Sequence, residues 1–208
     1  MMGDAELRKP PRRADIMAMP IAAPRYTVDD LAAWPEDGQR YELLDGVLLV
    51  TPSPALPHQV VATRIAAALT EFTARSPGIL VSAPGVVTAP PATELQPDIL
   101  VFRRPTHGDR WTGVTEYLLA VEIESPSSRI YDRDFKRLAY QSLGVRTVWR
   151  VVIDVRTVYV TEAGSEDEVA RVDEVAWAPE EVTEPLTLSF DALLTDLGHG
   201  LEDPREDR

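Results

Sequence analysis

The chain has 208 residues, a formal net charge of −13 and no cysteine, which leaves room for one α/β domain and little for a second. No stretch approaches the roughly 20 consecutive apolar residues that a membrane-spanning helix needs, and disulfides, thiolate zinc sites and cysteine nucleophiles are excluded. With only three histidines, a metal ion would be held mainly by carboxylate and carbonyl oxygens, which favours a hard cation such as Mg²⁺ or Mn²⁺.

The first residues mix arginine, proline and methionine without a continuous apolar run. We expect residues 1–24 to be a disordered leader without a secretory signal, and therefore a cytoplasmic protein. Thr27 precedes Asp30 by three residues, a capping-box pattern that predicts a short helix to about Trp34.

A β-hairpin is predicted next, because Asp45-Gly46 separates two apolar runs at residues 41–44 and 47–51. From His58 to Phe72, apolar residues recur at the spacing of one face of an amphipathic helix.

Short apolar runs bounded by proline, glycine or charge predict the strands that follow. They cover residues 79–82, 85–88, 99–102, 117–123, 147–153 and 157–161. A second helix is predicted after Ser125-Pro126, ending near Gly144 in the C-cap position. This order of elements predicts an α/β fold with a mixed β-sheet flanked by α-helices.

The negative charge is concentrated at the C-terminal end, where residues 161–208 hold 15 acidic and 3 basic residues. We expect residues 25–160 to form the core domain and residues 161–208 to form an acidic extension that packs on it or trails from it. A weak strand pattern at 169–177 and a short helix at 190–197 lie in this extension. The charge of the core is near neutral, which weakens a nucleic-acid function without excluding it.

Charged residues interrupt apolar segments at three places. Asp98 opens one predicted strand, Glu122 lies inside another, and Lys136 follows on the next helix. Buried carboxylates are costly unless they are paired or bound to metal, and the strand period places Glu124 on the face of Glu122. Converging acids would repel one another without a cation, which favours a metal site. The alternative for Lys136 is an ordinary surface ion pair with Asp132.

Together these residues resemble the Uma-type restriction endonucleases of the PD-(D/E)xK nuclease superfamily. The resemblance covers roughly residues 26–160. It rests on Tyr41-Glu-Leu-Leu-Asp-Gly46, Pro52-Ser-Pro54, His58, Pro97-Asp98, Val121-Glu-Ile-Glu-Ser-Pro-Ser-Ser128, Asp132, Lys136, Tyr140 and Gly144-Val145.

The resemblance implies a restriction-endonuclease-like core with a metal site at the open edge of its sheet. Asp98, Glu122 and the carbonyl of Ile123 would bind the metal, and Lys136 would match a lysine moved from the strand to the next helix. Glu42 would help to order metal or water. Glu124 occupies the usual position of that lysine and is a candidate for a further metal ligand.

The function predicted in this way is Mg²⁺- or Mn²⁺-dependent hydrolysis of DNA, with Asp98, Glu122, Lys136 and Glu42 as the catalytic residues. Candidate substrate contacts are His58, Arg103, Arg104 and Arg129, although Arg103 and Arg104 would by default belong to a solvated loop. A homodimer would match enzymes that cut two strands. Two alternatives stay open: an inactive binding or regulatory module with the same fold, and an acidic C-terminal segment that masks the DNA-binding surface.

Overall fold

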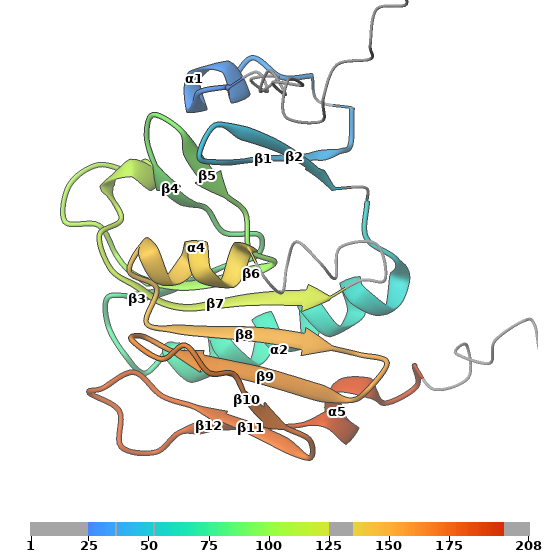
Figure 1. Cartoon of the computed structure of the whole chain (residues 1–208). Helices are drawn as coiled ribbons and strands as arrows, with labels where there is room; N and C mark the ends of the chain where they lie inside the picture. The colour runs from blue at the N-terminus through green and yellow to red at the C-terminus, as the bar shows by residue number, and fades with distance from the viewer. Residues whose placement is uncertain (1–24, 36, 52, 125–134, 198–208) are drawn as a thin grey trace, which may run out of the picture.

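The computed structural model describes residues 25–35, 37–51, 53–124 and 135–197 (Figure 1). The predicted leader, residues 125–134 with Arg129 and Asp132, and residues 198–208 lie outside this described part.

A six-stranded sheet forms the centre of the molecule, in the order β10-β9-β8-β7-β6-β3. The strands are β3 (Ile79–Ser82), β6 (Ile99–Arg103), β7 (Tyr117–Glu124), β8 (Thr147–Val152), β9 (Thr157–Glu162) and β10 (Val169–Arg171). β7 and β8 are parallel, whereas the other neighbours are antiparallel. The predicted mixed sheet is therefore confirmed. β8 is buried along its whole length, as expected for a central strand covered on both faces, and its buried residues include Arg150.

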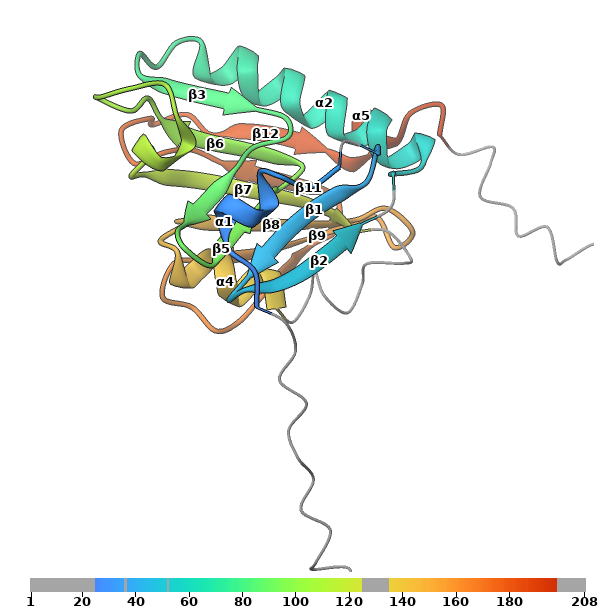
Figure 2. The ribbon, with the colours of Figure 1, turned by 90° about the horizontal axis from the view of Figure 1, so that it is seen from above.

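Helix α2 (Leu56–Thr73) covers one face of this sheet (Figure 2). Its apolar stripe packs against alternate strand residues such as Ile99, Val101 and Val121. The intervening residues, including Leu100 and Ala120, point to the other face. There they meet α4 (Arg137–Ser142), which is the described part of the second predicted helix.

A second sheet lies on the α4 side, in the order β2-β1-β5-β4. Its strands are β1 (Arg40–Leu44), β2 (Val47–Thr51), β4 (Val87–Ala89) and β5 (Thr93–Leu95), with α1 (Val28–Leu31) at its edge. Asp45 and Gly46 both have positive φ angles, 50° and 78°, as the predicted hairpin turn requires. The capping box of Thr27 and Asp30 is also present.

Two short strands were not predicted. β5 and β12 (Leu186–Ser189) hold three and four residues, too few to show a clear alternation. The segment between β6 and β7 contains a short 3₁₀ turn, η2 (Trp111–Gly113). The strand predicted from residue 85 begins at Val87 instead, because the Gly85 N–H donates to the Pro97 carbonyl.

Over its described residues, the C-terminal segment packs on the core. The predicted boundary at residue 160 falls inside β9. Beyond it, the hairpin of β11 (Glu174–Trp177) and β12 leads to α5 (Phe190–Leu194), and Trp177 and Phe190 join the apolar cluster under α2. Within the described part of the chain, no helix is long and apolar enough to cross a membrane.

Candidate active site

The site begins where β7 extends beyond its neighbour β6. The antiparallel register ends at Ile99 opposite Val121, and Pro97 has no N–H group with which to continue it. The Ile123 N–H donates instead to Asp98 Oδ2, at 2.8 Å. This contact fixes the Asp98 carboxylate beside the end of β7, close to Glu122.

Lys136 joins the two sheets at this point. Its Nζ lies 2.9 Å from Glu42 Oε2 and 3.2 Å from Glu122 Oε1. All three residues are buried, with Glu42 fully inaccessible. The Gln96 N–H donates to the other Glu42 oxygen at 2.7 Å. β1, β7 and the turn before α4 therefore bring together three of the four predicted catalytic residues.

Tyr140, one helical turn after Lys136, also contacts Glu122. Its hydroxyl donates to Glu122 Oε1 at 2.5 Å, and the side chain is fully buried. Burial, together with the nearby Glu122 and Glu42 charges, raises the pKa of Tyr140 well above its usual value. Tyr140 is therefore a neutral donor that fixes one carboxylate oxygen.

Asp98, the fourth predicted catalytic residue, has two basic partners. Arg40 Nη1 lies 2.9 Å from Oδ1, and His58 Nε2 lies 3.0 Å from Oδ2. Burial disfavours the charged carboxylate, but the hydrogen bond and charge of His58 and the charge of Arg40 outweigh burial and lower the pKa of Asp98. For Arg40, burial disfavours the charged guanidinium and acts to lower its pKa. The nearby carboxylates of Asp98, Glu122 and Glu42 outweigh this effect of burial, so the pKa of Arg40 is raised.

The cluster is thus partly neutralised by the protein itself. Lys136 lies between Glu42 and Glu122, and Arg40 lies on Asp98. The expectation that converging acids must repel without a bound metal is therefore too strong, because these two cations offset much of the repulsion.

Glu124 has a different cationic partner. Its Oε2 lies 2.6 Å from Arg150 Nη1, and Arg150 also pairs with Glu168 at 2.9 Å. The Arg150 guanidinium lies 4.0 Å from the centre of the Tyr159 ring. The role of Glu124 as a metal ligand stays a prediction, and an ion binding there would compete with Arg150.

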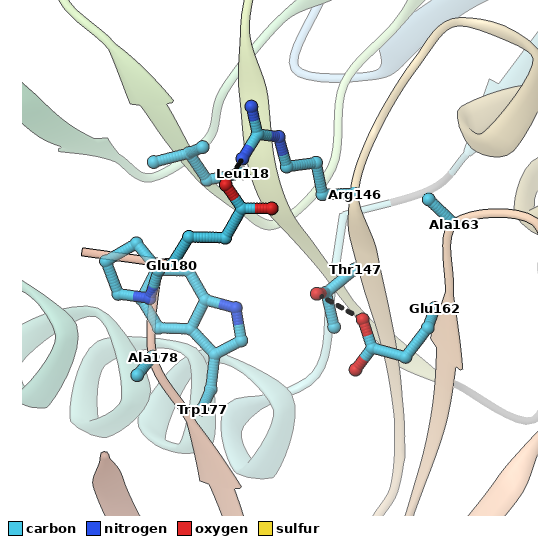
Figure 3. Close-up of a pocket in the computed structure, with 9 residues that line it drawn as sticks. Leu118, Arg146, Thr147, Glu162, Ala163, Trp177, Ala178 and Glu180 are labelled. Carbon is cyan, nitrogen blue, oxygen red and sulfur yellow. Dashed lines mark hydrogen bonds and ion pairs between the residues drawn. The ribbon is translucent and has the colours of Figure 1, made fainter. Parts of the chain in front are cut away.

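Two of the candidate substrate contacts lie away from the cluster. Arg103 ends β6, five residues after Asp98 and so about 16 Å along the strand, and it pairs with Glu116 and Glu181. The Arg104 N–H donates to the Gly78 carbonyl. A hollow at that end of the sheet is lined by Arg146, Trp177 and Glu180 among others (Figure 3). Arg103 and Arg104 therefore do not share a site with Asp98, whereas His58 does.

Arg40 was missed by the sequence analysis and Tyr140 was given no role. Strand alternation could have placed Arg40 on the face of Glu42. The four-residue spacing does place Tyr140 on the helix edge of Lys136, but no contact with Glu122 was predicted from it.

The oxygen atoms at the end of β7 are suitable ligands for a hard cation. Asp98 and Glu122 offer carboxylate oxygens, and the N–H and C=O of one strand residue face the same side, so the Ile123 carbonyl faces the side of Asp98. Oxygen ligands of this kind bind Mg²⁺ or Mn²⁺. In the part of the chain that the structure describes, no three His, Asp or Glu side chains are arranged to hold a metal ion. A metal here would therefore depend on the backbone carbonyl and water.

Comparisons with known proteins identify the family and the fold of the chain. The family model "Uma2: Putative restriction endonuclease" matches residues 28–194. A solved structure described as a "putative nuclease" from Anabaena variabilis has a TM-score of 0.59 and 20% sequence identity, covering 80% of this chain and 96% of that chain. That likeness shows the fold. No curated protein matches the chain. Since the family match spans most of its length, the chain belongs to the Uma2 family of restriction-endonuclease-like proteins.

Proposed function

We propose that this protein is a Mg²⁺- or Mn²⁺-dependent endonuclease that hydrolyses DNA phosphodiester bonds. The observation that carries the proposal is the buried convergence of Glu42 and Glu122 on Lys136 at one edge of the central sheet, with the buried Asp98 carboxylate held beside them at the end of β7. Burying such charges is costly and adds little to stability, and clusters of this kind are typical of functional sites. The family description supports the same reaction class.

Asp98, Glu122 and the Ile123 carbonyl would hold the metal ion, with Glu124 as the candidate for a further ligand. When bound, the ion would lower the pKa of a coordinated water and offset negative charge on the scissile phosphate.

The protein's own residues would orient the reactants. Lys136 Nζ is held between two carboxylates, where an ammonium can orient the attacking water and stabilise the charge that develops on the phosphate oxygens. Glu42 fixes that ammonium from the opposite sheet, and Tyr140 fixes the Glu122 oxygen that faces it. Water attacks phosphorus in line with the leaving oxygen, the phosphorus–oxygen bond breaks, and the leaving oxygen takes up a proton.

A second candidate function is a nuclease-fold module that binds a partner without cutting. The specific observation in its favour is that Lys136 and Arg40 already offset the buried carboxylates, so the fold does not depend on a metal ion for charge balance.

Plasmid and oligonucleotide cleavage with Mg²⁺ or Mn²⁺ separates the two functions. Asp98→Asn and Glu122→Gln should each lower the cleavage rate at least on the order of 100-fold, while the exposed control Glu180→Gln should not. Thermal unfolding should show that each variant is folded. Full activity in both site variants would remove these assignments. An inactive wild-type protein with no Mg²⁺ affinity in calorimetry would favour the binding module.

We further propose that the enzyme acts as a homodimer, because cleavage of both strands of a duplex calls for two sites. We also propose that it acts in the cytoplasm. Light scattering coupled to size-exclusion chromatography, with and without duplex DNA, tests the oligomeric state.

A further inference from the structure

Arg40 is the most accessible charged side chain of the site. It opens β1, and its side chain is 22% exposed. The side chains of Asp98, His58, Glu42, Glu122 and Lys136 are each no more than 10% exposed. An approaching DNA backbone would therefore meet Arg40 before it met those groups.

Among the described residues, the hydrogen bonds of Arg40 use only one of its three nitrogens. Nη1 donates to Asp98 Oδ1 at 2.9 Å and to the Gln96 carbonyl at 3.2 Å. Within the described ranges, no residue accepts a hydrogen bond from its Nε or Nη2. These two nitrogens form one edge of the planar guanidinium, and such an edge can donate two parallel hydrogen bonds to a pair of phosphate oxygens.

The contacts of Nη1 also set the direction of that edge. Because a carboxylate and a backbone carbonyl hold the same nitrogen, the planar group is oriented before any ligand binds, and less rotamer entropy is lost on binding. The nearby carboxylates keep the pKa of Arg40 raised, so the group is cationic at every pH at which the fold would work.

We propose that Arg40 binds a phosphate of the DNA backbone through its Nε–Nη2 edge while Nη1 stays on Asp98, and so places that phosphate beside the catalytic cluster. This inference rests on the proposed function and assigns substrate binding to a residue at the mouth of the same site. The competing role is a purely structural one, in which Arg40 serves only as the counter-ion of Asp98.

The test measures binding of a fluorescent DNA duplex to the full chain by anisotropy, over a series of salt concentrations and with Ca²⁺ in place of Mg²⁺ to slow cleavage. The variants are Arg40→Gln, which removes the charge, and Arg40→Lys, which keeps the charge but loses the planar edge. The matched control is Arg146→Gln. Arg146 is exposed and paired with Glu116 and Glu180 near the start of β8 (Figure 3).

The Arg40→Gln variant loses one phosphate contact, so its affinity for DNA should fall on the order of 10-fold. It should also reduce the slope of log affinity against log salt by about 0.9. Arg40→Lys should keep the slope and lose part of the affinity, and Arg146→Gln should change neither. Arg40→Lys also keeps a cation beside Asp98, so it stays informative if Arg40→Gln does not fold.

A merely structural Arg40 gives a different pattern. Arg40→Gln and Arg40→Lys would then alter Ca²⁺ affinity or thermal stability but leave DNA affinity and the salt slope of each folded variant at the wild-type values, which would overturn the inference. If the wild type binds or cuts DNA and the variants behave in that way, only this inference fails. If the wild type neither binds nor cuts DNA, the proposed function fails with it.

Discussion

At the scale of single residues, the site is a chain of buried hydrogen bonds with two anchoring cations. Tyr140 and Lys136 both contact the same oxygen of Glu122, and Lys136 extends the network to Glu42 in the other sheet. Since each partner is largely shielded from water, loss of one donor leaves an under-solvated carboxylate. Such a loss costs more than the hydrogen bond itself contributes.

Tyr140→Phe tests this network and its pH dependence. The variant loses a hydrogen bond to a charged group, so its free energy of unfolding at neutral pH should fall by about 1.5–3 kcal/mol. The folded-state pKa of Tyr140 is raised, so its contribution is fully present below the unfolded pKa of about 10 and is lost as pH rises from there towards the folded-state value.

Urea unfolding of the wild type and Tyr140→Phe, from neutral pH to above pH 10, measures this difference. The difference in the free energy of unfolding between the two proteins should narrow only at the alkaline end, because the phenylalanine variant cannot ionise at this position. A gap that stays constant through the whole range would contradict the assignment of a buried neutral donor.

At the scale of elements, close contact between the two sheets positions Asp98. The Gly85 N–H donates to the carbonyl of Pro97, the residue before Asp98. A Cβ added at Gly85 would lie 2.2 Å from Leu100 Cβ, which is far inside van der Waals contact. The segment leading into β4 can approach β6 this closely only because residue 85 has no side chain.

Gly85→Ala should therefore push β4 away from β6 and move Pro97 and Asp98. We expect a loss of about 1–3 kcal/mol in the free energy of unfolding, together with lower cleavage activity. Gly164→Ala is the control, since nothing lies within 4 Å of its added Cβ. Its cost of roughly 1 kcal/mol comes from a positive φ, and its activity should be unchanged. Equal effects in the two variants would show that the contact with Leu100 is not required.

At the scale of the whole molecule, the acidic C-terminal segment contributes to the core. Val175, Trp177, Leu188, Phe190 and Leu193 are all buried in the cluster under α2. Arg64 on α2 also donates from Nη1 to the carbonyls of Leu193 and Thr195, both at 2.8 Å. Deleting this segment to uncover a DNA surface would therefore remove part of the fold.

A chain that ends at Glu162 should lose cooperative unfolding. Burial of each large apolar side chain contributes about 1.5–3 kcal/mol, so the loss of five approaches or exceeds the stability of a typical domain, about 5–15 kcal/mol. A chain that ends at Leu197 keeps all five and serves as the control. Circular dichroism during thermal unfolding distinguishes them. A sharp transition in the shorter chain would show that this segment is dispensable for folding.

Much of the local structure and most of the candidate catalytic residues could be predicted from the sequence alone. The hairpin at Asp45-Gly46 and the capping box at Thr27 depend on neighbouring residues, so local chemistry was sufficient to predict them. Asp98 and Glu122 stood out because a carboxylate in an apolar strand is costly without a partner. The resemblance to the family added Glu42 and indicated the position of Lys136.

The pairing of the charged residues could not be predicted, because it depends on the packing of distant segments. Arg40 contacts Asp98 across 58 positions in the sequence, Arg150 reaches Glu124 across 26, and Arg103 lies at the far end of the strand that Asp98 opens. Such pairings depend on strand order and register, which local residue patterns do not specify. The same reason explains why a segment read as an acidic extension buries Trp177 and Phe190 in the core.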